Sequence, residues 1–158
     1  MALDPSARES NVRDSIKKYF VDNLYRIEAV EITFDTMLDT PKVQNPNSPI
    51  DKWVSINFGS FNFDNMSDHE LSIFCCVRKD PEGFVLTQLR DKVVGYLTDS
   101  TKTDGLARIP FYRSYADRAW ELLGALLVYI ETETGQMVAP DGTKFKMIPV
   151  TLKWGAKP

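Results

Sequence analysis

Apolar residues recur every three or four positions in two stretches of the chain, which is the spacing of one face of an α-helix. The first stretch covers residues 10–24, and its stripe consists of Val12, Ile16, Tyr19, Phe20 and Leu24. The second follows a turn at residues 80–83 and runs to about residue 97, with a stripe of Leu86, Leu89, Val93 and Leu97. The sequence therefore predicts two amphipathic helices, each with one face for a core.

Elsewhere apolar and polar residues alternate, which is typical of strands. The predicted strands cover residues 29–34, 53–63, 71–78, 107–112, about 122–132 and 145–154. A short turn of helix is expected between residue 115 and the fifth of these strands. Pro110 and Pro149 each remove a ladder donor, so the strands that contain them are expected at a sheet edge, or beside a bulge for Pro110.

The second predicted strand changes phase part-way along. Val54, Ile56 and Phe58 share one face, but the apolar set then continues at Phe61 and Phe63. One extra residue in the strand produces such a change, and Gly59 with Ser60 is the natural place for it. The strand should form a bulged hairpin with residues 71–78.

Helices separated by pairs of strands indicate an α+β fold, with a mixed, largely antiparallel sheet of about six strands packed by two main helices. The length fits one domain over residues 1–158. Residues 35–52 contain three prolines and form a long predicted loop. Either the loop is a flexible insertion, or it is an arm that orders against a partner by burying Val43, Ile50 and Trp53.

Charge and hydropathy exclude several classes of protein. A net charge of −3 and a pI near 5.2 disfavour a dedicated nucleic-acid binder. Apolar runs fall short of the 18 or more residues that a membrane span needs, and residues 1–10 lack the apolar segment of a signal peptide. Synthesis in a reducing cytoplasm follows as the expectation, and the adjacent Cys75 and Cys76 fit it as inert strand residues.

The chain's one histidine, His69, lies among Asp64, Asp68 and Glu70. A metal site would need these carboxylates as further ligands, but short polar residues at 64–68 are also what a turn requires. A nucleophilic pair of His69 with Cys75 or Cys76 is disfavoured because one extended strand holds the histidine and the cysteines roughly 20 Å apart. The turn is the preferred interpretation, so the sequence predicts no enzyme and no catalytic, cofactor-binding or metal-binding residues.

Aromatic and other large apolar residues also occur in loops or on strand positions opposite the core stripe. Protein interfaces are enriched in such residues, whereas a sheet covered on both faces would bury some of them internally. Interfaces are the preferred interpretation. The candidate assembly interface consists of Val43, Ile50, Trp53, Phe74, Tyr112, Tyr129 and Met137.

The order of elements resembles that of the tail terminator, or tail completion, proteins of long-tailed bacteriophages. The resemblance rests on VRDSIKKYFVDNL followed by AVEITFD, then on WVSINFGSF, ELSIFCCVRKD and FVLTQLRDKVVGYL. It is a likeness of pattern and order over most of the chain. The long loop at 35–52 departs from the shorter members of the family.

The resemblance implies a structural virion protein that caps the tail tube as a hexameric ring of itself, ends tube polymerisation and joins the tail to the head. Its implied partners are its own copies, the tail tube protein and a neck or connector protein, with DNA only as passing cargo and no membrane. It implies no cofactor. The alternatives are another neck or head-completion protein and, in a different class, a small metal-dependent hydrolase centred on His69.

Overall fold

The computed structural model describes residues 9–37, 50–62, 66–114 and 120–155. Its helices are α1 (Glu9–Phe20), continued by one π-helical turn, η2 (Val21–Tyr25), and α2 (Phe84–Gly95). Its strands are β1 (Glu31–Phe34), β2 (Lys52–Asn62), β3 (Met66–Val77), β4 (Arg108–Ser114), β5 (Trp120–Ile130), β6 (Met137–Val138) and β7 (Lys144–Gly155).

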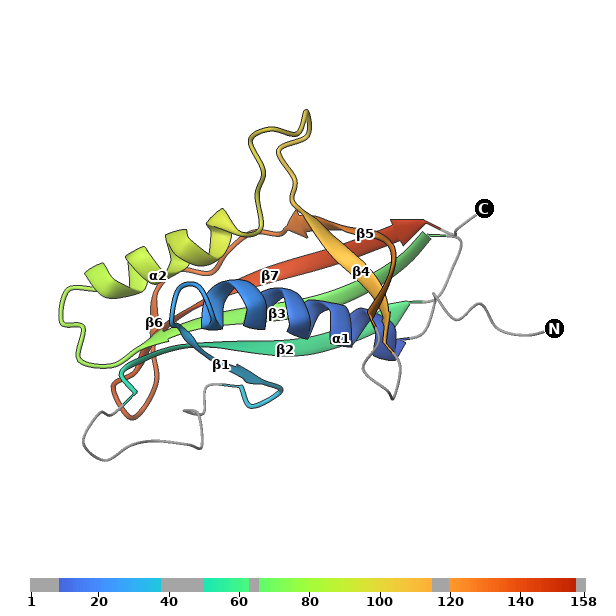
Figure 1. The fold of residues 1–158 in the computed structure, drawn as a ribbon. Helices are drawn as coiled ribbons and strands as arrows, with labels where there is room; N and C mark the ends of the chain where they lie inside the picture. The colour runs from blue at the N-terminus through green and yellow to red at the C-terminus, as the bar shows by residue number, and fades with distance from the viewer. Residues whose placement is uncertain (1–8, 38–49, 63–65, 115–119, 156–158) are drawn as a thin grey trace.

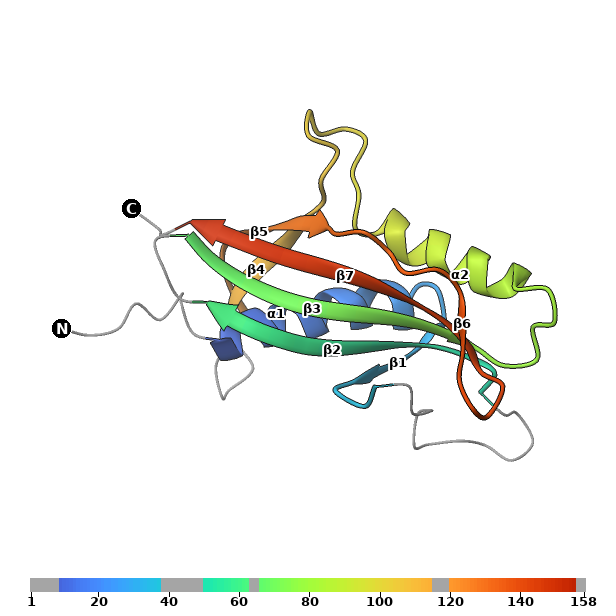
Figure 2. The same cartoon turned by 180° about the vertical axis from the view of Figure 1, so that it is seen from behind.

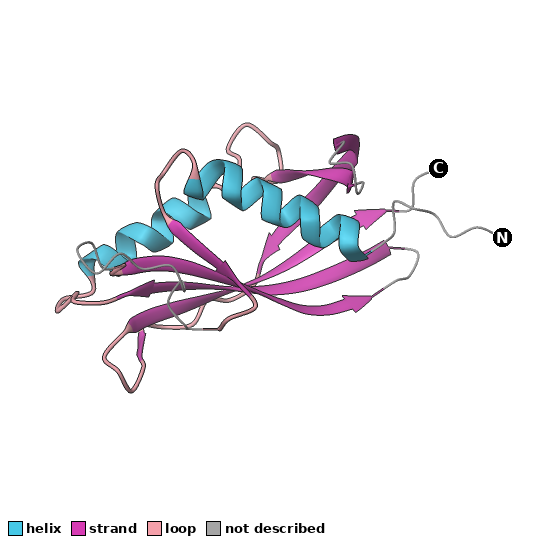
Figure 3. Cartoon of the chain, turned by 60° about the horizontal axis from the view of Figure 1, so that its bottom comes forward, coloured by secondary structure: helices cyan, strands magenta, loops and turns pink. Residues whose placement is uncertain are grey.

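The strands form one sheet in the order β1-β2-β3-β7-β5-β4, and β6 pairs with β7 beside β5. The β1 and β2 pair is parallel, whereas the other pairs are antiparallel. Both helices lie on the same face of the twisted sheet (Figures 1 and 3), and the view from behind shows strands in front of α1 (Figure 2). The predicted α+β class, with a mixed and largely antiparallel sheet, is confirmed.

The main core fills the space between the helices and the sheet face that they cover. From α1 and η2 it takes Val12, Ile16, Phe20 and Leu24, and from α2 it takes Leu86, Leu89 and Val93. The sheet contributes alternate residues, including Ile56, Ile73, Val128, Ile148 and Leu152. Burying each such side chain contributes roughly 1.5–3 kcal/mol. The predicted apolar stripes of both helices are therefore the buried ones.

The predicted bulge in β2 is present. β2 and β3 form an antiparallel hairpin whose register shifts between Phe58 and Phe61. A Cβ added at Gly59 would lie 3.2 Å from the carbonyl oxygen of Glu70 on β3, so a larger residue would press on the partner backbone. Glycine at this position thus permits the close approach as well as the change of phase.

The two prolines lie in different settings. Pro110 is on β4, the terminal strand of the sheet, which confirms the predicted edge. The prediction for Pro149 is wrong, because β7 lies between β3 and β5. The Pro149 carbonyl accepts from Glu131 N at 2.9 Å, just past the last pair of β5 with β7. The missing N–H of Pro149 would therefore point toward the β5 side of β7, just past the last residue pair of these strands. The hydrogen bonds between β7 and β3 do not need it.

Parts of two other predictions lie outside the described residues. Of the predicted loop at 35–52, the structure describes residues 35–37 and 50–52. The predicted short helical turn between residues 115 and 122 lies mostly outside as well, and β5 is already a strand from Trp120. The β3 strand begins at Met66, earlier than the predicted residue 71.

A buried serine joins α1 to the edge of the sheet. The hydroxyl of Ser15 accepts a hydrogen bond from Tyr112 N on β4 at 2.8 Å and donates to the carbonyl of Asn11 at 2.7 Å. Since Tyr112 N points away from β5, no strand supplies its partner. The helix side chain satisfies this edge amide instead of a further strand.

We predict that Ser15→Ala lowers the free energy of unfolding by about 1–3 kcal/mol, because it leaves the buried amide of Tyr112 without an acceptor. Urea unfolding followed by circular dichroism measures the change. Ser100→Ala is the matched control, since Ser100 is exposed in a loop. Equal midpoints for the two variants would contradict the role given to Ser15.

Candidate functional site

His69 is fully buried on the core face of β3. Its ring lies between those of Phe58 and Phe61, with centroid distances of 5.6 Å and 5.5 Å. Neither ring nitrogen has a hydrogen-bond partner. A general base or metal ligand needs access to the group on which it acts, and these rings leave His69 none.

Charged groups close the outer side of this aromatic cluster. The guanidinium of Arg13 lies 4.2 Å from the centroid of the Phe58 ring and pairs with the carboxylate of Asp35. Asp35 also accepts from Phe58 N at 3.0 Å. Burial lowers the pKa of His69; Arg13 adds to the shift, while Glu9 and Asp35 oppose it. The folded protein therefore favours the neutral imidazole.

The acids near His69 in the sequence do not converge on it. Asp68 and Glu70 flank His69 on β3, and successive strand residues point to opposite faces. Asp64 lies outside the described residues. Within the described ranges, no group of three or more His, Cys, Asp and Glu side chains could hold a metal ion.

The cysteines point to opposite faces of the sheet, as predicted. Cys75 belongs to the main core, and Cys76 belongs to a second cluster on the other face. Both are free thiols. Burial raises the pKa of Cys76 to about 12 and raises that of Cys75 further. Thiolates, the reactive form, are thus scarce at neutral pH.

Two of the predicted interface residues lie inside the chain. Trp53 and Phe74 are buried with Cys76 in the second cluster, and Ile50, Phe145 and Met147 pack against them. The Arg78 guanidinium lies 5.2 Å from the Trp53 ring centroid. Trp53 and Phe74 are therefore buried internally, which was the alternative to an interface. The sheet face opposite the helices carries a small core of its own around these two residues.

The other predicted interface residues are spread over the molecule. Tyr112 is half-buried and packs edge-on against Trp120, with centroids 5.8 Å apart. Tyr129 is half-buried under Lys153. Met137 is exposed on β6, and Val43 lies outside the described residues. The structure therefore brings Ile50, Trp53 and Phe74 together but not the whole predicted set.

Sequence reasoning missed several exposed large apolar residues. On β5, Leu122 is 63% exposed and Trp120 is 44% exposed. At the other end of the sheet, Val138 on β6 is 61% exposed and Phe84 at the start of α2 is 67% exposed. The start of β5 and β6 lie at opposite ends of the long axis in Figures 1 and 2.

The exposure of Trp120 and Leu122 follows from a bulge in β5 that Gly124 marks in the sequence. The register of β4 and β5 shifts between Phe111 and Tyr112, with Leu123 as the extra residue on β5. Gly124 is next to this bulge, as Gly59 is next to the bulge in β2. The shift turns Leu122 and Trp120 away from the core face that Leu126 and Val128 occupy, so these two side chains are exposed.

Trp120 also lines a hollow of about 400 Å³ along the outer side of α1 and η2. The ammonium of Lys18 lies 5.6 Å from its ring centroid and 5.7 Å from that of Tyr112. Lys18 pairs with Asp22 at 2.6 Å, and Asp22 also pairs with Arg26. The hollow offers an aromatic ring beside charged groups of both signs, which suits contact with a protein surface.

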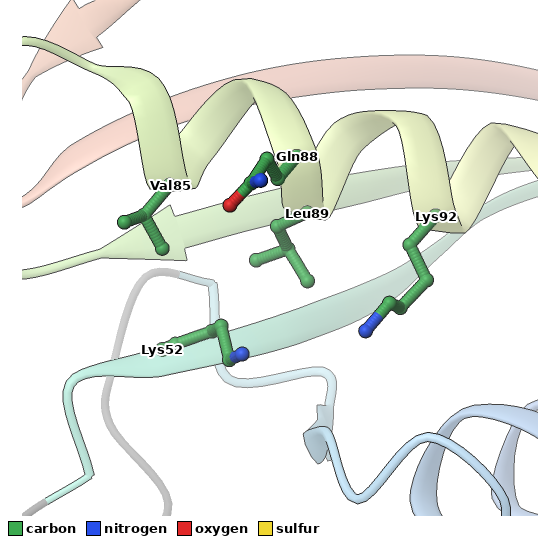
Figure 4. A pocket seen from close by; sticks show the side chains of 5 residues that line it. All are labelled: Lys52, Val85, Gln88, Leu89 and Lys92. Carbon is green, nitrogen blue, oxygen red and sulfur yellow. The ribbon is translucent and has the colours of Figure 1, made fainter.

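A second hollow, of about 210 Å³, lies between α2 and the start of β2 (Figure 4). Its lining residues are Lys52, Val85, Gln88, Leu89 and Lys92. Lys92 pairs with Glu28 at 3.3 Å, and Tyr96 donates to the same carboxylate at 2.8 Å. These contacts lower the pKa of Glu28, and the hydrogen bond from Tyr96 has the largest effect. This lining contains neither a nucleophile paired with a base nor a metal-binding set.

No family model and no curated protein matches the chain. Among solved structures, 11 chains match. One of them, a protein that carries no functional name, is 9% identical to this chain, with a TM-score of 0.57 over 96% of this chain and 98% of its own. A likeness at that identity shows the fold alone. None of the helices in the described part is long and apolar enough to cross a membrane.

We predict that acid destabilises the protein through His69. The unfolded chain binds a proton at this residue below about pH 6.5, whereas the folded chain, with its lowered pKa, does not. The contribution of His69 to the free energy of unfolding is therefore fully present above about pH 6.5. It falls by about 1.4 kcal/mol per pH unit as the pH drops toward the folded pKa.

His69→Leu should remove this slope, since leucine fits the apolar site and does not titrate. Urea unfolding of both proteins between about pH 5 and pH 8 measures the difference, in the range where histidine titrates. His69 is the chain's one histidine, so the comparison isolates it. Parallel pH profiles for the two proteins would show that His69 does not carry the effect.

Proposed function

We propose that this chain is a structural component of a phage tail that caps the end of the tail tube as a ring and joins it to the neck. One observation carries the proposal. The exposed large apolar side chains of the described residues include two groups at opposite ends of the sheet, Trp120 with Leu122 on β5 and Val138 with Phe84. The order of elements, which resembles the tail terminator family, supplies the kind of assembly.

A subunit that joins a ring of its own copies and also contacts the tube or the neck needs more than one interaction surface. In a heterologous contact one surface of a subunit meets a different surface of its neighbour, and repetition closes a ring when the rotation permits. Isolated exposed apolar residues are common on proteins, but those on β5 adjoin the Tyr112 ring and the hollow along α1. They thus extend an aromatic surface of a kind enriched in interfaces.

The setting of His69 weighs against the competing hydrolase. A hydrolase centred on this residue needs an imidazole that reaches substrate or metal-bound water. Here the imidazole is fully buried and packs against two phenyl rings, and one of them, Phe58, also contacts Arg13. Moving the Phe58 ring aside would also break its contact with Arg13. The structural role therefore accounts better for this part of the chain.

We predict that the protein, added to polymerising tail tube subunits at about one ring per tube, stops tube growth and appears as a ring at the tube end in electron micrographs. Trp120→Lys and Val138→Lys should each raise the protein concentration needed for arrest about tenfold or more, since an interface side chain of this size contributes about 1–3 kcal/mol.

Thr103→Lys is the charge-matched control, because Thr103 is exposed in the loop before β4. It should arrest tubes as the unchanged protein does. Tubes that lengthen unimpeded in the presence of the unchanged protein would overturn the proposal. Circular dichroism of each variant separates a lost contact from a lost fold.

A further inference from the structure

β5 has a strand on both sides over only part of its length. It pairs with β4 from Trp120 to Leu127, but it pairs with β7 only from Leu127 to Ile130. β7 continues along β3 to Gly155, whereas β5 turns away with β4 over α1 (Figure 1). Residues 120–126 therefore have one neighbouring strand within the described sheet.

The ladder shows which backbone groups face the open side. Glu131 N bonds to the carbonyl of Pro149 on β7 at 2.9 Å, so every second residue before it, including Leu127 and Ala125, presents its N–H and C=O to the β7 side. Leu127 is the last of these to pair with β7. Ala125 lies opposite Pro110, which has no N–H to exchange with it. The polar backbone of Ala125 thus faces the side that β7 has left.

The side chains leave this edge accessible. Trp120, Leu122, Gly124 and Ala125 are all exposed. Proteins usually protect a free edge with lysine, proline or a covering element, but β5 contains neither of these residues, and its one charge, Glu121, pairs with Arg113. An open edge with apolar side chains binds extended strands.

We propose that residues 120–126 of β5 bind strand β1 of a second copy of this chain, so that the sheets of neighbouring copies join edge to edge. The inference rests on the proposed ring, in which this pairing would be the contact between neighbouring subunits. β4 is also terminal, but α1 packs on its outer side and Ser15 bonds to it. β1 is the other terminal strand of the described sheet, in which its one neighbour is β2.

The backbone of β1 fits this role. Asp35 N, just after β1, bonds to the carbonyl of Ile56 on β2, so alternate residues back along the strand also face β2. The backbone groups of Ile32 and Phe34 therefore point away from β2, toward the edge of the sheet. The contact joins two different edges and is heterologous, as ring closure requires.

Self-association in the absence of any tube tests the inference separately from the proposed function. Sedimentation velocity over about a hundredfold range of concentration should show the unchanged protein forming oligomers as concentration rises. Ala125→Pro removes the outward N–H and should weaken association about tenfold or more. Thr103→Lys, in the exposed loop before β4 and outside this edge, should associate as the unchanged protein does.

Leu122→Lys adds a charge to the edge without altering the backbone and should weaken association even if Ala125→Pro fails to fold. Hydrogen exchange then identifies the strands, because residues 120–126 and 31–34 should both exchange more slowly in the oligomer. A protein that stays monomeric overturns the inference, although monomers that still arrest tubes would leave the proposed function standing. Slowing at 120–126 without slowing at 31–34 would show another partner strand and would also overturn it.

Discussion

The attachment of β4 to α1 determines how the rest of the sheet is arranged. Ser15 bonds to the backbone of Tyr112 and Lys18 lies over the Tyr112 ring, and β4 follows the helix over the covered face. β5 stays paired with β4, and it therefore cannot remain beside β7 over its whole length. β5 thus leaves β7 at Leu127 because one sheet encloses α1 between its two ends. The core and the open edge have the same origin.

Cations on α1 reinforce this enclosure on both sides of the helix. Toward β1 and β2, Arg13 lies over Phe58 and Lys17 lies 5.4 Å from the centroid of Phe34. Toward β4 and β5, Lys18 lies near two aromatic rings. Each such contact contributes roughly 0.5–1 kcal/mol at an exposed site. Because the contacts lie on opposite flanks, together they fix the rotation of the helix about its axis, which keeps its apolar stripe on the sheet.

Local patterns were enough to predict the helices, most strands and the bulge at Gly59, because each of these depends on residues close in sequence. Strand order depends on distant pairings, so the central position of β7 and the setting of Pro149 could not be predicted from alternation. The same limit explains Trp53 and Phe74. Alternation correctly assigned them to the face away from the helices, but it cannot show that this face buries a small core. The exposure of Trp120 and Leu122 was missed because alternation continued back from Leu126 and Val128 places them on the core face, whereas the bulge beside Gly124 turns them to the other face.

The central position of β7 also bears on synthesis of the protein. β7 follows every other strand in the chain, yet it joins β3 to β5, and Ser72 pairs with Pro149 across the middle of the sheet. While the ribosome has not yet released β7, β3 and β5 have no strand between them, and the two halves of the sheet cannot unite. The curled sheet, and with it the open edge of β5, takes its final form only after this last strand is inserted. Until then, the edges of β3 and β5 that β7 covers stay unpaired in the nascent chain.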